Sequence, residues 1–198
     1  MLLLLSSLLP SCAPSQPPRW AEGGAQLLIA PARWERGDED PVEIQADGKV
    51  LEGGKLRFTI DRVGRVTDDS YDAFAILLPD GHVVGTDDRA LGYVGVSNAT
   101  PPLSSQAWLS LAPDGHVVFF HPDGDRGALG QWTGCNGPNR RSCTLVTQIF
   151  LVQNLRMAPM YGPTFGVGYV GGYDDGCYVT RRIMTPHGYR LRTVNVCY

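Results

Sequence analysis

The chain has 198 residues, 17 of them basic and 20 acidic, with a mean hydropathy of -0.12. This slightly acidic balance gives no global electrostatic case for nucleic-acid binding, and a hydrophobic fraction of 43% excludes a disordered chain. The 24 glycines and 15 prolines favour short strands joined by turns. We therefore expect a mainly β protein of antiparallel hairpin-repeat sheets, in a small sandwich or barrel-like domain, with at most one helix near residues 144–157.

An apolar run at residues 2–9, interrupted by two serines, stands near the start of the sequence. It has the length of a signal-peptide core and is too short to span a bilayer, which takes about 20 residues. Residues 1–11 are therefore predicted to be a signal peptide. Residues 12–24 are rich in proline, serine and glycine and are predicted to be a lipid anchor followed by a flexible linker.

The tetrapeptide Leu9-Pro10-Ser11-Cys12 follows this run. Its aliphatic first residue, and the small residue just before the cysteine, resemble the lipobox of bacterial lipoproteins. The resemblance implies that Cys12 is lipidated and that its acyl chains hold the protein in the membrane of the bacterial cell envelope. Ala13, the residue after the cysteine, is similar to the residue at this position in lipoproteins sent to the outer membrane. The alternative is an ordinary secretory signal beside an incidental cysteine.

A β domain is expected over residues 25–134, with strands at 26–29, 42–45 and 55–60. Two hairpin repeats, 73–92 and 107–130, follow these strands. In the repeats Leu78-Pro79-Asp80-Gly81-His82-Val83-Val84 returns as Ala112-Pro113-Asp114-Gly115-His116-Val117-Val118. Proline, aspartate and glycine suit successive corners of a tight turn, so each unit predicts strand, turn, strand, turn and strand. The pattern is similar to short repeats in secreted bacterial proteins of uncharacterised families.

Residues 135–198 are expected to pack on the same domain as a disulfide-containing C-terminal part. Within it, the stretch from Cys143 to Met157 is ambiguous. Its length and apolar spacing favour a helix, whereas its many β-branched residues favour a strand, so both interpretations stay open.

Four cysteines, Cys135, Cys143, Cys177 and Cys197, remain beside Cys12. In an oxidising compartment they predict two disulfides, for which three connectivities exist. Cys135 and Cys143 flank a run unsuited to regular structure. The other two flank an expected terminal hairpin, in which a loop at 186–188 sets Thr185 opposite Tyr189 and Cys177 opposite Cys197. We predict the pairs Cys135–Cys143 and Cys177–Cys197. A zinc site is the rival interpretation, but the sequence has no Cys-x-x-Cys pair, and no metal or cofactor is expected.

Other chemistry-bearing residues have simple structural interpretations. His82 and His116 follow turn glycines, where solvated strand-entry positions are expected. The spacing of Asp123 and Asp125 is similar to that of the first two ligands of a calcium loop. A turn stabilised by the aspartate side chains is the favoured interpretation. Four arginines of the terminal hairpin, Arg181, Arg182, Arg190 and Arg192, are candidates for binding an anionic glycan or lipid head group. Protection of an exposed strand edge is the simpler interpretation of these arginines.

No catalytic residue is predicted, because the sequence lacks the common nucleophile and phosphate-loop motifs. We favour a non-enzymatic, envelope-anchored lipoprotein that displays a β-rich binding or structural domain. Its expected partners are the membrane, through the anchor, and an envelope glycan or protein. One alternative is an envelope glycan hydrolase that uses aspartates of the repeat turns. Another is an integral outer-membrane barrel, suggested by the alternation of Val194, Val196 and Tyr198.

Overall fold

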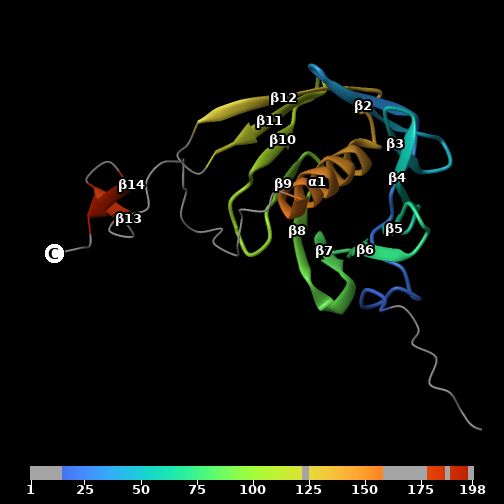
Figure 1. Cartoon of the computed structure of the whole chain (residues 1–198), viewed down its shortest axis with the longest axis horizontal. Helices are drawn as coiled ribbons and strands as arrows, with labels where there is room; N and C mark the ends of the chain where they lie inside the picture. Colours follow the sequence, from blue (N-terminus) through green and yellow to red (C-terminus); the bar gives the residue numbers. More distant parts are fainter. Residues whose placement is uncertain (1–14, 122–124, 158–177, 186–187, 196–198) are drawn as a thin grey trace, which may run out of the picture.

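The computed structural model describes residues 15–121, 125–157, 178–185 and 188–195 (Figure 1). Across these residues, twelve antiparallel strands form a closed barrel, one α-helix follows them, and two further strands pair with each other. The barrel strands are β1 (Ala32–Arg36), β2 (Glu39–Ile44), β3 (Lys49–Glu52), β4 (Lys55–Ile60), β5 (Arg65–Asp68), β6 (Ala73–Leu77), β7 (His82–Gly85), β8 (Ala90–Val94), β9 (Asn98–Thr100), β10 (Leu109–Leu111), β11 (His116–Phe120) and β12 (Arg126–Thr133). The helix is α1 (Arg140–Met157), and the separate strands are β13 (Tyr178–Thr185) and β14 (Gly188–Asn195).

The mainly β fold, its barrel form and its single helix confirm the predicted fold class. Each barrel strand pairs with its neighbour in the sequence, and β1 pairs with β12 to close the barrel, with Trp34 opposite Trp132. Closure leaves the barrel without an unpaired strand edge. β14, which contains Val194, pairs with β13 and is not a strand of the barrel.

The helix α1 lies inside the curve of the barrel strands (Figure 1), and its central part is buried on every side. All residues from 142 to 150 are buried, whichever side of the helix they occupy. A helix that is buried all round must be surrounded by protein, and the barrel wall provides this environment. The ring of Phe150 packs against Phe58 of β4 and Trp34 of β1, with centroids 5.4 and 6.2 Å away. The ambiguous stretch is therefore a helix at the centre of the core.

A turn of the kind predicted for the two repeats occurs four times at one end of the barrel. Two hairpins earlier in the chain have it in addition to the two repeats. In each turn a glycine has a positive φ, and an aspartate accepts the backbone N–H two residues further along. The glycine carbonyl then accepts a hydrogen bond of 2.7–2.9 Å from the backbone N–H near the end of the second strand after the turn. The four pairs are Gly48 with Ile60, Gly64 with Leu77, Gly81 with Val94 and Gly115 with Trp132.

Two of the three other predicted strands are confirmed, as β2 and β4, but residues 26–29 do not form a strand. The segment that contains them follows the turns of the barrel instead. The backbone N–H groups of Gly24, Ala25 and Leu27 donate to the carbonyls of Val63, Leu77 and Arg62. Pro17 is buried and Ser15 donates to Asp87, so residues expected to be a flexible linker already contact the barrel.

The predicted register of the terminal hairpin is wrong by one residue. Thr185 pairs with Gly188 and Met184 pairs with Tyr189, so the loop consists of residues 186 and 187 alone. A loop of two residues is the commonest hairpin connection, and a shift of one residue changes every cross-strand pair. Cys177 and Cys197, whose pairing was inferred from the wrong register, lie outside the described residues.

We predict that Gly115→Ala destabilises the protein more than Gly81→Ala. Both glycines have a positive φ, which costs about 1–2 kcal/mol for a residue with a Cβ. The added Cβ at Gly115 would lie 2.0 Å from the carbonyl oxygen of Trp132, whereas at Gly81 it would meet the movable ring of Tyr93. Urea denaturation should give the larger loss of unfolding free energy for Gly115→Ala.

Gly37→Ala is the matched control, since Gly37 also has a positive φ but nothing lies within 4 Å of the added Cβ. The loss of unfolding free energy for Gly37→Ala measures backbone strain alone. Equal losses at Gly37 and Gly115 would contradict the close backbone approach in the repeated turn.

Candidate functional site

The interior of the barrel is filled by α1, whose buried polar side chains bond to the wall. The indole N–H of Trp132 donates to Thr147 Oγ1 at 3.0 Å, and that of Trp108 donates to Gln148 Oε1 at 2.7 Å. Gln148 Nε2 donates to the carbonyl oxygens of Leu91, at 2.8 Å, and Thr100, at 3.0 Å. Both donors of the Gln148 amide are therefore used inside the protein. Over the residues that the structure describes, this interior is a packed core of buried side chains.

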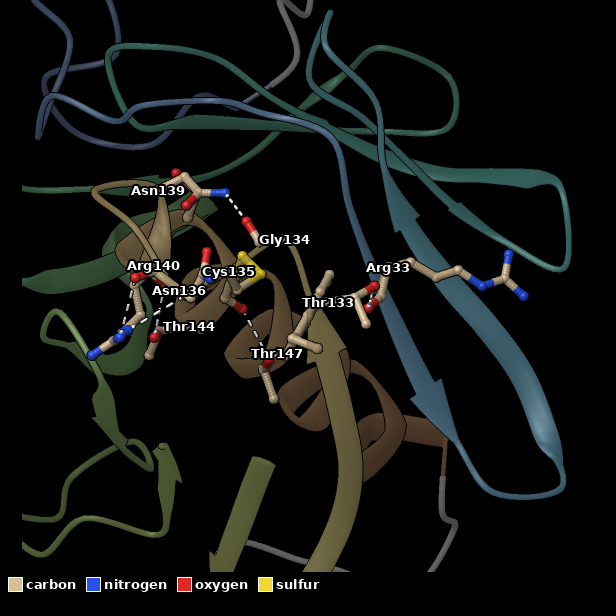
Figure 2. The surroundings of a disulfide bond; sticks show 12 residues. Arg33, Thr133, Gly134, Cys135, Asn136, Asn139, Arg140, Thr144 and Thr147 are labelled. Atoms are coloured by element: carbon tan, nitrogen blue, oxygen red, sulfur yellow. Dashed lines mark hydrogen bonds between the residues drawn. A yellow bond between two sulfur atoms is a disulfide. The ribbon is translucent and has the colours of Figure 1, made fainter. Parts of the chain in front are cut away.

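The disulfide Cys135–Cys143 fixes the start of this helix (Figure 2) and confirms the first predicted cysteine pair. Cys135 follows the end of β12, Cys143 lies in the first turn of α1, and both are buried. Asn139 lies between them, and its side-chain Nδ2 donates to the Gly134 carbonyl at 2.7 Å. The backbone carbonyl of Asn139 accepts the Ser142 N–H at 2.9 Å. Closing this loop of eight residues lowers the entropy of the unfolded chain by an equivalent of about 2.5 kcal/mol.

A depression of about 420 Å³ lies at the seam between β1 and β12, beside the helix. Arg36 is its central charged residue, with 7% of its side chain exposed. Its guanidinium pairs with Glu39 at 2.8 Å and Glu52 at 2.5 Å, and lies over the rings of Trp34 and Phe150. Glu52 also pairs with Arg57 at 3.2 Å, so two carboxylates balance two cations in this cluster, and the arrangement is that of an ion-pair network at the seam.

A shallower depression of about 500 Å³ lies between β1 and β2 on the outer surface. Its charged residues, Arg33 and Glu43, form an ion pair with each other, and Glu35 also pairs with Arg33. The remaining lining is Pro31, Ala32, Ile44, Gln45, Ala46, Thr133 and Gly134. Among these described lining residues, the charged side chains are held in ion pairs with one another.

Two equivalent Asp–His pairs occupy the predicted repeat turns. His82 Nδ1 lies 3.1 Å from Asp80 Oδ2, and His116 Nδ1 lies 3.0 Å from Asp114 Oδ2. Both imidazoles are exposed, as expected for strand-entry residues. The backbone N–H of each histidine donates to the aspartate, and this bond, with the ring contact, lowers the pKa of both carboxyls. A lowered pKa does not suit these aspartates to the general-acid role of a glycosidase, which requires a carboxyl of raised pKa.

The other predicted site residues are distributed over separate parts of the chain. Cys12 and Asp123 lie outside the described residues, and the Asp125 carbonyl accepts the N–H of His121 in the turn between β11 and β12. In β13 and β14, Arg181 pairs with Arg192 and Arg190 pairs with Ile183. Arg182 pairs with Leu191. Three of the four predicted arginines are thus brought together at neighbouring positions of one hairpin face.

The described residues contain no group of three or more histidines, cysteines, aspartates or glutamates arranged to hold a metal ion. None of their helices is long and apolar enough to cross a membrane.

Comparison with protein-family models, with curated proteins and with solved structures found no match to the chain. Sequence reasoning missed Gln148 and Arg36 as fixed polar groups of the core. The one glutamine in the mostly apolar run 144–152 was the available signal for Gln148, whereas nothing in the local sequence distinguished Arg36.

We predict that Gln148→Met lowers the free energy of unfolding by at least about 2 kcal/mol. Methionine has a similar volume, but it leaves the buried Trp108 indole and the carbonyls of Leu91 and Thr100 without their partner, and each such group costs about 1–3 kcal/mol. Urea denaturation measures the loss. The control is Gln131→Met, which removes one exposed hydrogen bond to the Asp114 carbonyl. A loss no larger than that of the control would contradict the role of Gln148.

We predict that the stability difference between the parent and the double variant Asp80→Asn/Asp114→Asn depends on pH. The folded pKa of each carboxyl is below its unfolded value, so each contributes stability above the unfolded pKa and loses it as the pH falls through the folded pKa. The difference in unfolding free energy should therefore be largest above about pH 5 and should shrink toward about pH 2.

The control for this pH series is Asp38→Asn, at an exposed turn position between β1 and β2. The asparagines keep an oxygen that accepts the histidine N–H, so they remove charge and retain the turn. A stability difference for the double variant that stays constant from pH 6 to about 2 would contradict the prediction.

Proposed function

We propose that the protein is a non-enzymatic lipoprotein of the bacterial cell envelope, anchored through Cys12, in which the barrel serves as a displayed binding or structural domain. The observation that carries the proposal is the helix in the barrel. Because α1 occupies the lumen and its polar groups bond to the wall, the described part of the barrel interior is a packed core and not a substrate chamber. Its work is therefore done by its outer surface and by the segments attached to it.

Two features support the location in an exported compartment. The disulfide Cys135–Cys143 lies in the core, and structural disulfides are typical of proteins that fold in oxidising compartments. The lipobox-like residues Leu9 to Cys12 supply a signal for lipidation. The same signal and its Ala13 support an outer-membrane position, with an envelope glycan or protein as the further partner.

The distance from anchor to barrel is short under this proposal. Ser15 is three residues from Cys12, and its hydroxyl donates to Asp87 in the turn after β7 at 2.7 Å. Three residues span at most about 10 Å, so a lipid on Cys12 would hold the barrel close to the membrane surface. A short, partly packed connection is consistent with a domain that acts at the surface on which it is anchored.

We predict that cells supplied with an alkyne fatty acid label the parent protein and do not label Cys12→Ala. The thiol of Cys12 is the acceptor that the proposal requires, and alanine removes it. Labelling is read by click chemistry on the immunoprecipitated protein, and detergent partitioning should show the parent in the membrane fraction.

The matched control is Ser11→Ala, which keeps a small residue before the cysteine and should retain the label. Equal labelling of the parent and Cys12→Ala would contradict anchoring at this residue. An unlabelled parent would contradict the lipoprotein proposal itself.

A further inference from the structure

The hairpin formed by β13 and β14 differs in charge from the rest of the chain. Residues 178–195 contain four arginines and no acidic residue. The whole chain has 17 basic and 20 acidic residues, so the remainder holds 13 basic residues against all 20 acidic ones. The hairpin is therefore a cationic segment attached to an acidic protein, and its charge needs a separate explanation.

The register of the hairpin places three of its arginines on one face. Arg181 lies directly opposite Arg192, and Arg190, opposite Ile183, occupies the next pair on the same face. Arg182 pairs with Leu191 and is on the other face, because alternate residues of a strand belong to opposite faces. The one-residue difference from the predicted register decides this grouping.

Such a grouping of like charges favours the binding of an anion. Like charges directly opposite each other destabilise a strand pair, and a two-stranded hairpin is only marginally stable by itself. An anion that binds the three arginines removes this repulsion and so stabilises the folded hairpin. Arginine suits phosphate in particular, because its planar guanidinium donates two parallel hydrogen bonds.

The residues that share the face with these arginines favour a membrane as the source of the phosphates. Val179 and Val194 form one pair on that face, and Ile183 is opposite Arg190. Alternating apolar and cationic positions suit the interface of a bilayer, where apolar groups enter the acyl boundary and cations meet the headgroups. An acidic protein surface would neutralise the arginines but would leave these aliphatic residues without an apolar environment.

We propose that the arginine face, Arg181, Arg190 and Arg192 on β13 and β14, binds the phosphate groups of an anionic phospholipid membrane. This gives the protein a second membrane contact, separate from the lipid on Cys12. The grouping of the arginines on one face does not depend on the proposed anchoring at Cys12. The choice of a membrane as the partner of this face rests in part on that anchoring. The hairpin contact adds electrostatic attraction and a preferred orientation to an anchor that otherwise only tethers.

The test uses the full-length Cys12→Ala protein, so that lipidation makes no contribution. Flotation with vesicles of phosphatidylcholine alone, or with one-third phosphatidylglycerol, measures binding at about 0.1 M salt, where charges beyond about 10 Å are screened. We expect binding to the anionic vesicles only. Arg190→Gln should weaken it about fivefold, and Arg181→Gln/Arg192→Gln more than tenfold, because each arginine near the surface contributes a similar factor.

Arg182→Gln is the matched control, since it removes the same charge from the opposite face of the same strands. It should weaken binding less than twofold, and circular dichroism checks that all variants keep the parent's fold. Equal weakening by Arg182→Gln and Arg190→Gln would overturn the arginine face. Binding equal on neutral and anionic vesicles, or self-association of the protein without vesicle binding, would overturn the membrane as partner. Failure of fatty-acid labelling would refute anchoring at Cys12 and leave this vesicle test unaffected.

Discussion

The packing of α1 inside the closed barrel is the interaction on which the rest of the structure depends. A barrel of about eight strands is just wide enough for its own side chains to fill, so twelve strands enclose a space that needs further filling. The helix fills it, and rings from several strands, including Phe58 and Trp132, pack against it or bond to it. Wall and helix therefore stabilise each other, and the barrel core is complete only after the helix, which follows all twelve strands, has entered.

The helix in turn depends on its surroundings more than on its own sequence. Its β-branched residues, such as Thr144, Val146 and Ile149, have low intrinsic helix propensity. Inside the barrel, a helix satisfies its own backbone hydrogen bonds, which an extended segment there would leave without partners. The disulfide and the Asn139 contacts then fix where the helix begins, and Gln148 fixes its position against the wall. Buried hydrogen bonds of this kind select one arrangement among several apolar packings.

Because the helix fills the barrel, the proposed functional contacts lie on segments outside the barrel strands. The segment from Pro17 to Leu27 crosses the repeated turns, and the cationic hairpin follows the helix in the sequence. One of these segments comes directly after the candidate anchor at Cys12, and the other carries the arginine face. The proposed roles thus place both membrane contacts in segments that the barrel strands do not include. The barrel itself provides a rigid body, whose closed sheet resists edge-to-edge association.

The sequence by itself determined the features that depend on local chemistry. Asp-Gly turns predicted the hairpins, their spacing predicted antiparallel strands, and the short loop between Cys135 and Cys143 predicted the disulfide, because each is fixed by residues close together in the chain. Only the tertiary structure decided between sandwich and barrel, since closure depends on the pairing of β1 with β12, about 100 residues apart. It also decided that residues 140–157 form a helix, because burial on every side replaces the propensity that the sequence lacks. The hairpin register was decided in the same way. A change of one residue in the loop length changes which residues share a face, and the composition of the loop does not specify its length.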